Sequence, residues 1–151
     1  DPRYYAKTSD KFPANVGVII DRPAYLPMLT GLENLIQLAS VRKIIGEKEA
    51  LRALERVGLS ADIKQRVRNY SLGMRQRLAV AQAFMESQQL LLLDEAFNGL
   101  DVEGVNLIRE LLVHLKNEGR TIVITSHNQD DIDAVCDEVY KIEDRHFERV
   151  R

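Results

Sequence analysis

Hydrophobic and polar positions along this chain change period, and they predict strands toward both ends with a helical block between them. The continuous apolar runs at residues 16–20 and 90–93 are too short to span a membrane, and such runs are typical of strands buried on both faces of an α/β sheet. Residues 121–125, rich in β-branched side chains, and residues 138–142 predict two more strands. Strand and helix therefore alternate outside the central helical region.

Three helices are predicted in the central region. Thr30 and Glu33 have the spacing of a capping box, in which a threonine hydroxyl and a glutamate carboxylate satisfy backbone donors at a helix start. That helix is expected to run to about Lys43. A second helix is expected to end at Gly58, and a third to begin near Ser71.

The number of these helices predicts how the chain is divided. Three helices between two strands are more than an ordinary crossover connection needs, so we expect residues 28–88 to form an inserted helical subdomain. Residues 1–27 and 89–151 then form an α/β core with a mostly parallel sheet.

The composition narrows the possible functions. Of the 151 residues, 45% are hydrophobic and 29% are charged, which suits one soluble domain or a large part of one. A formal net charge of −2 gives no overall basic field, so nucleic acid is not expected as a partner. The single cysteine, Cys136, excludes an internal disulfide and favours a reducing compartment. No segment has the pattern of a signal peptide or a transmembrane helix, so any role at a membrane is expected to go through a partner.

Polar side chains follow three of the predicted strands: Asp21, the pair Asp94 and Glu95, and His127. The active sites of α/β sheets lie at the carboxyl ends of the strands. Asp94 can hold Mg²⁺, and Glu95 can take a proton from an attacking water. His127 can hold a terminal phosphate or position that water. The simpler interpretations are a core strand followed by an acidic helix cap, and a surface imidazole at a capped helix start.

A serine hydroxyl, a small residue and a helix N-terminus coincide at Ser71 to Gly73. Together these features can bind an anion, because the free N–H groups and the helix dipole both favour negative charge. The simpler interpretation is that Ser71 only caps the helix.

In order and spacing, four segments resemble the ATP-binding cassette (ABC) family: YSLGMRQRL at 70–78, LLLLDE at 90–95, NGLD at 98–101 and SH at 126–127. The resemblance spans nearly the whole chain and implies a P-loop NTPase core of the ABC ATPase type with an inserted helical subdomain. Most relatives have Gly and Gln at the positions of Leu72 and Met74. The Leu and Met found here are similar to the motif of the bacterial bacitracin-export and lantibiotic-immunity transporters.

The resemblance also implies roles for single residues. Ser71, Gly73 and Met74 look like the signature motif, which contacts the γ-phosphate of ATP held by the opposite subunit. Asp94 looks like the aspartate that organises Mg²⁺, and Glu95 is similar to the catalytic base.

Three further positions take roles from the resemblance. Asp101 ends a segment similar to the D-loop, which crosses the dimer interface toward the ATP of the opposite subunit. His127 looks like the switch histidine of the catalytic site. Asp21 occupies the Q-loop position, where most relatives have glutamine, and is expected to act with Asp94 at the metal.

One part of the family pattern is missing. No Gly-x-x-x-x-Gly-Lys-Ser/Thr occurs, so the loop that cradles the phosphates in the family is absent. We expect the chain to be a truncated piece of a nucleotide-binding subunit that by itself cannot bind ATP. The resemblance implies that the missing strand lies in the middle of the sheet, between the strands at 121–125 and 139–142. We therefore expect the final strand to shift or detach, or the gap to pair with another chain.

The resemblance implies the ATPase subunit of a bacterial ABC exporter of a peptide antibiotic or similar drug. Its ligands would be ATP and Mg²⁺, and its partners a second ATPase subunit and integral membrane permease subunits. It would lie in the cytoplasm, on the inner face of the membrane. Two alternatives remain open: a non-catalytic binding or regulatory module, and a soluble ABC ATPase with no role in transport.

Overall fold

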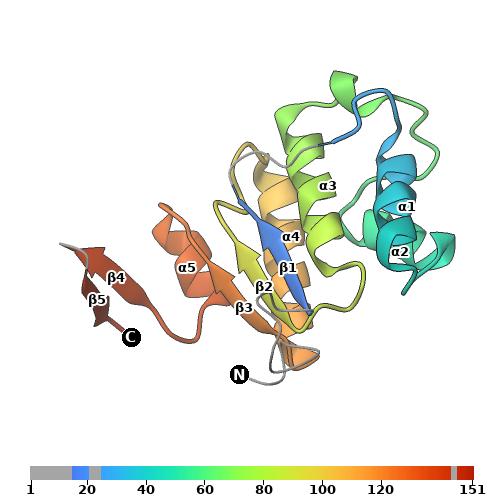
Figure 1. Cartoon of the computed structure of the whole chain (residues 1–151). Helices are drawn as coiled ribbons and strands as arrows, with labels where there is room; N and C mark the ends of the chain where they lie inside the picture. Colours follow the sequence, from blue (N-terminus) through green and yellow to red (C-terminus); the bar gives the residue numbers. More distant parts are fainter. Residues whose placement is uncertain (1–14, 21–24, 144–145) are drawn as a thin grey trace.

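The computed structural model describes residues 15–20, 25–143 and 146–151 (Figure 1). In chain order the elements are β1 (Val16–Ile19), α1 (Gly31–Arg42), α2 (Glu47–Arg56), a 3-10 turn (Val67–Asn69), α3 (Leu72–Phe84), β2 (Leu90–Leu93), α4 (Val102–Asn117), β3 (Thr121–Ile124), α5 (Gln129–Val135), β4 (Tyr140–Glu143) and β5 (His146–Arg149). The expected order of strands around a helical block is confirmed.

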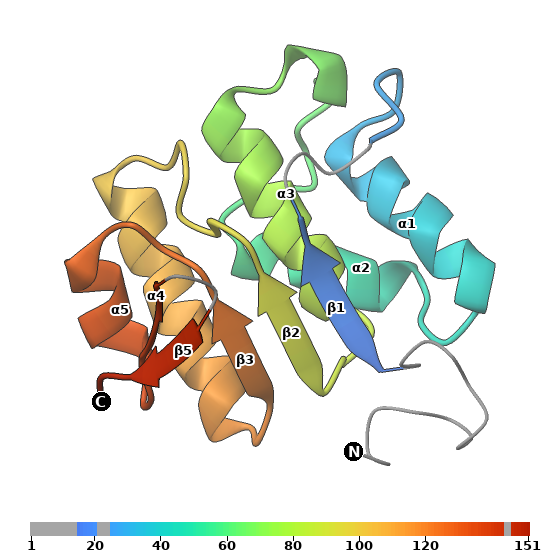
Figure 2. The same cartoon turned by 60° about the vertical axis from the view of Figure 1, so that its left-hand side comes forward.

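The central sheet is parallel, in the order β1-β2-β3. Figure 2 shows the three strands side by side with their arrowheads toward the same edge. Because neighbouring strands pair in register, Ile19, Leu93 and Ile124 lie side by side at that edge. The carboxyl ends of the strands therefore meet at one place, as the sequence predicts.

The two faces of this sheet differ. Ile19, Leu91 and Leu93 are buried, whereas Val18, Leu92 and Val123, which pair in one row across the strands, are 41%, 37% and 52% exposed. The expectation that the apolar strands are buried on both faces is therefore wrong for the described part of the chain. Its helices shield only one face of the sheet.

Helix α3 approaches the sheet closely at Gly17. A Cβ at this position would lie 1.7 Å from the carbonyl oxygen of Ala83, so only glycine allows this approach. The contact sets α3 directly against β1, and the residues of the predicted signature motif lie at the N-terminus of this helix.

The helix boundaries follow the sequence signals. The Thr30 amide donates to Glu33 Oε2 over 2.7 Å, and the Glu33 amide donates to Thr30 Oγ1 over 3.3 Å, which confirms the capping box. Gly58, with a φ of 71°, follows α2 in the left-handed conformation that glycine adopts without strain. Ser71 caps α3 as expected, because its hydroxyl accepts from the Met74 amide over 3.1 Å.

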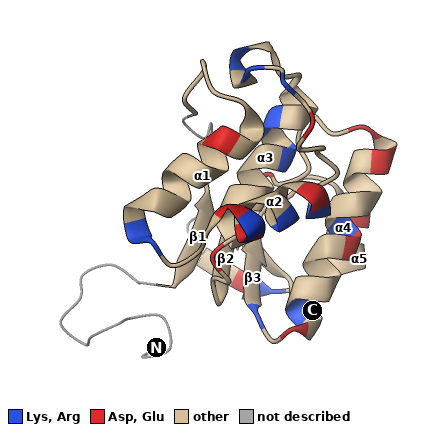
Figure 3. Ribbon diagram, turned by 90° about the vertical axis from the view of Figure 1, so that its right-hand side faces the viewer, with Lys and Arg blue, Asp and Glu red and all other residues tan. Residues whose placement is uncertain are grey.

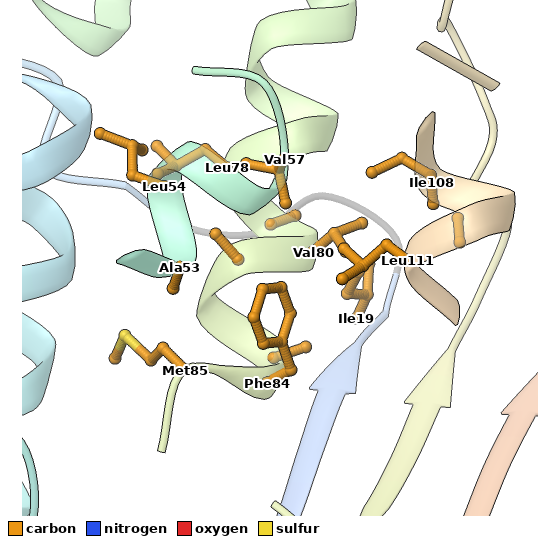
Figure 4. Packing of buried hydrophobic residues seen from close by; sticks show 14 of the residues in the cluster. Ile19, Ala53, Leu54, Val57, Leu78, Val80, Phe84, Met85, Ile108 and Leu111 are labelled. Carbon is orange, nitrogen blue, oxygen red and sulfur yellow. The ribbon is translucent and has the colours of Figure 1, made fainter. Parts of the chain in front are cut away.

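The buried side chains form one cluster that joins the helical block to the sheet. Figure 4 shows Val57 and Phe84 of the helical block packing beside Ile19, Ile108 and Leu111 of the core. The division at residues 28–88 therefore stays a prediction, since the cluster is continuous across it.

The last predicted strand behaves differently from a strand of the parallel sheet. β4 begins at Tyr140 and pairs antiparallel with β5 in a separate two-stranded hairpin (Figure 1). Residues 138–142 are therefore not a fourth parallel strand. Of the two expected outcomes, the structure shows the one in which the final strand shifts or detaches. A partner only a few residues away in sequence costs little loop entropy, which favours the hairpin over a distant pairing across a gap.

No helix in the described ranges is long and apolar enough to cross a membrane. Figure 3 shows basic and acidic residues interspersed over the face formed by α2, α3 and α4, with neither sign dominating.

Candidate active site

The strongest cluster of predicted residues lies where β2 and β3 end. Asp94 and Glu95 follow β2, and His127 follows β3 after two residues. His127 Nε2 lies 2.9 Å from Glu95 Oε1, with the imidazole almost fully exposed and the carboxylate about one-third exposed. The two side chains thus form a polar pair that is open to a ligand.

Thr125 connects Asp94 and Glu95. Its hydroxyl donates to Asp94 Oδ1 and accepts from the Glu95 amide over 3.1 Å. The sequence analysis did not select this residue, although a hydroxyl at the first position after a β-branched strand is a signal that could have identified it. The hydroxyl fixes both acidic residues to the neighbouring strand.

The backbone of Glu95 is in an unusual conformation. Its φ is 50°, in the left-handed region that costs a residue with a side chain about 1–2 kcal/mol. The Glu95 carbonyl accepts from the Asn98 amide over 3.0 Å and from Gln76 Nε2 over 3.1 Å. Strained residues of this kind persist where the surroundings hold them, and they gather at functional sites. Gln76 is not among the site residues that the sequence predicts.

The predicted signature motif, residues 71–74, lies at the N-terminus of α3. Ser71 is exposed and Gly73 and Met74 are partly buried, with the Ser71 hydroxyl engaged as the helix cap. Capping is the simpler interpretation of Ser71, and it does not exclude a second hydrogen bond, because a hydroxyl can also donate. The phosphate contact stays a prediction.

Asp101 caps helix α4 at the end of the predicted D-loop. Its Oδ1 accepts from the Gly104 amide over 2.9 Å and from Arg77 Nη2 over 3.0 Å. The hydrogen bond from the Gly104 amide, followed by the hydrogen bond and charge of Arg77, holds the pKa of this carboxyl below its usual range. Asp101 is therefore an anion in the folded protein at neutral pH.

The loop that carries His127 is anchored by a buried carboxylate. Asp131 is 3% exposed, and its Oδ1 accepts from Arg109 Nε over 2.9 Å and from Arg109 Nη2. Its other oxygen accepts from the Ser126 hydroxyl over 3.3 Å. Asp131 of α5 therefore connects Arg109 of α4 to Ser126, the residue before His127.

The donor set suits Mg²⁺. The ion usually takes one or two carboxylates, with phosphate oxygens and waters completing an octahedron. Asp94 is an exposed carboxylate at a strand end, beside the Thr125 hydroxyl. The described residues contain no cluster of three or more His, Cys, Asp or Glu side chains that could enclose a metal. Asp21, the second predicted ligand, lies outside the described residues.

In open α/β sheets ligands bind outside the carboxyl ends of the strands, which is where the acidic pair and the histidine lie. The family model for the ABC transporter matches residues 2–98, so the chain belongs to the ABC transporter family, as a protein of the ATP-binding type.

Individual relatives agree with this family. The chain is 41% identical over 135 residues to the bacitracin transport ATP-binding protein BcrA of Enterococcus faecalis, which covers 89% of the chain and 44% of BcrA. It is 36% identical over 122 residues to the lantibiotic transport ATP-binding protein SrtF of Streptococcus pyogenes, covering 81% of the chain and 53% of SrtF.

A solved structure supports the fold. The dimeric post-hydrolysis structure of the ATP-binding cassette MJ0796, bound to ADP and Pi, superimposes with a TM-score of 0.78. The likeness covers 91% of the chain and 63% of that structure at 23% identity, so it establishes the ABC ATPase fold. The chain spans about half the length of the curated relatives it matches.

Proposed function

We propose that this chain supplies the catalytic acidic pair and the signature helix of the ATPase subunit of a bacterial ABC exporter. The observation that carries the proposal is the contact of 2.9 Å between His127 and Glu95, beside Asp94 at the ends of two parallel strands. Its membership of the ABC transporter family supports ATP as the ligand.

The reaction is the in-line attack of water on the γ-phosphorus of ATP. A new bond forms from the water oxygen to phosphorus while the bond to the bridging oxygen breaks, and ADP leaves. Glu95 accepts the proton of the water, and His127, which contacts Glu95 through Nε2, can hold the γ-phosphate or position the water. Asp94 would hold Mg²⁺, and the ion would supply neutralisation of the charge on the phosphates.

The active unit is a head-to-tail pair of ATPase subunits. In that arrangement Ser71, Gly73 and Met74 meet the ATP of the opposite subunit, and Asp101 lies at the interface. The dimeric state of the MJ0796 cassette supports this assembly. The pair sits in the cytoplasm against permease subunits in the membrane. The similarity to BcrA, a bacitracin transport protein, and to SrtF, a lantibiotic transport protein, favours a peptide antibiotic as the exported substrate.

The test is ATP hydrolysis by the complete cassette that contains these residues. His127→Ala should reduce turnover by about 100-fold or more, because it removes a group that acts on the reacting phosphate. The matched control is His114→Ala, since His114 is exposed on α4 and pairs with Glu118 there. Equal turnover in the two variants would overturn the proposed role of His127.

A non-catalytic binding module is the second candidate, because the 151-residue sequence has no phosphate-cradling loop of its own. On our proposal the chain alone does not bind MgATP with useful affinity, whereas the complete cassette does. Calorimetric titration of MgATP into the isolated chain and into the complete cassette measures this difference. Micromolar MgATP binding by the isolated chain would contradict our expectation for the chain. Absence of hydrolysis by the complete cassette would favour the binding module.

A further inference from the structure

Leu72, the first residue of α3, packs against the turn that follows the catalytic acidic pair. A Cβ built on Gly99 would lie 2.5 Å from both Cγ and Cδ2 of Leu72. Gly99 also has a φ of 74°, which side chains rarely adopt. The leucine therefore fills the space beside the glycine, although 56% of its surface is exposed.

The next residue makes a reciprocal contact. A Cβ on Gly73 would lie 2.9 Å from the carbonyl oxygen of Gly99 and 3.8 Å from Leu100. The two glycines thus allow the backbone at the start of α3 to approach the turn, and Leu72 covers the approach from one side.

Two hydrogen bonds from the same helix hold the ends of this turn. Gln76 Nε2 donates to the Glu95 carbonyl over 3.1 Å, and Arg77 Nη2 donates to Asp101 Oδ1 over 3.0 Å. Gln76 is four residues after Leu72, and residues at that spacing share one face of a helix. One face of α3 therefore meets the segment 95–101 at its beginning, middle and end.

We propose that Leu72 is a positioning residue, which holds the middle of the segment 95–101 against α3 and so keeps Glu95 in place. The polar contacts fix the two ends, Ala96 and Phe97 are buried in the core, and Leu72 and Gly73 meet the Gly99 turn. Glu95 has a left-handed backbone conformation, and such a conformation persists only while its surroundings hold it. The consequence for catalysis rests on the proposed ATPase function. An exposed leucine without this role would be an ordinary surface residue.

The test is a double-mutant cycle in the complete cassette, with Leu72→Ala, Gly99→Ala and the pair. Leu72→Ala should lower kcat about 10-fold with KM for ATP changed less than about twofold, because a small displacement of Glu95 affects the chemical step. Leu72→Met, which fills similar space, should restore most of kcat. Because a partly unfolded sample would also lower the apparent kcat at unchanged KM, turnover is expressed per folded molecule, with the folded fraction of each variant measured by circular dichroism.

The cycle also has a control for backbone strain. Gly99→Ala should lower the unfolding midpoint less in the Leu72→Ala background, because the clash between the new Cβ and the leucine side chain is gone. Gly119 has a φ of 89° and no atom within 4 Å of a built Cβ, so Gly119→Ala should cost the same in both backgrounds. The unfolding midpoint is the readout, with a difference of about 3 °C expected between the backgrounds for Gly99→Ala.

The outcomes are distinct. Equal effects of Gly99→Ala in both backgrounds, or an unchanged kcat in Leu72→Ala, would overturn the role of Leu72. An inactive wild-type cassette would overturn the proposed function, and the unfolding cycle would still decide whether Leu72 holds the turn.

Discussion

The amide of Glu95 donates to the hydroxyl of Thr125 over 3.1 Å, which joins the ends of two neighbouring parallel strands. The same hydroxyl donates to Asp94 Oδ1. One threonine thus orients a predicted metal ligand through its side chain and a predicted base through its backbone. Positioning of this kind keeps a catalytic group where the reaction needs it.

Thr125→Val should therefore impair catalysis without unfolding the protein. Valine keeps the branched shape but neither donates to Asp94 nor accepts from Glu95. We expect turnover of the complete cassette to fall about 10-fold and the Mg²⁺ concentration for half-maximal rate to rise. Thr125→Ser keeps the hydroxyl and should retain most activity. Unchanged Mg²⁺ dependence in Thr125→Val would exclude this role.

Asp131→Ala should destabilise the cassette by about 3 kcal/mol, because it leaves the largely buried Arg109 without its partner. The matched control is Asp137→Ala, which breaks the ion pair of an Asp137 side chain that is 72% exposed and should change the free energy of unfolding by less than about 1 kcal/mol. Urea unfolding measures both. Similar losses in the free energy of unfolding would show that the ion pair of Asp131 with Arg109 stabilises the fold no more than an exposed ion pair does.

Asp101 should contribute a pH-dependent part of the stability. Hydrogen bonds from the Gly104 amide and Arg77 lower its folded pKa below the ordinary value of about 3.9. The contribution is therefore complete above the unfolded pKa and is lost as the pH falls through the folded pKa. Asp101→Asn keeps a capping oxygen but removes the charge. The stability gap between wild type and this variant, measured by urea unfolding, should be constant near pH 7 and close below about pH 4. A gap that is independent of pH would contradict the assignment.

The residues at the strand ends could be predicted because a parallel sheet brings its carboxyl ends together whatever the loops do. Asp94, Glu95 and His127 were selected on that basis, and the structure places Glu95 and His127 in contact. The sequence does not predict the role of Gln76, because it depends on a side-chain contact with a segment distant in sequence. The hydroxyl of Thr125 at the end of its strand is a usable signal, but the sequence does not show that both Asp94 and Glu95 bind it.

The final strand shows that a hydrophobic pattern predicts a strand but not the strand with which it pairs. The apolar pattern near residue 140 predicts a strand, and the structure has one, but the pattern contains no information on its partner. The exposed row of Val18, Leu92 and Val123 shows the same limit, since the apolar runs do not reveal how many faces the described chain covers.

The most direct test of the account is ATP turnover and ATP binding by Glu95→Gln in the complete cassette. Glutamine keeps the size of the side chain but cannot take the proton of the attacking water, so kcat should fall by about 100-fold or more. ATP affinity should be retained, and an ATP-bound dimer should accumulate in size-exclusion chromatography. Glu103→Gln, at an exposed first-turn position of α4, is the matched control and should turn over ATP like the wild type. Turnover in Glu95→Gln equal to that of Glu103→Gln would contradict the assignment of Glu95 as the base.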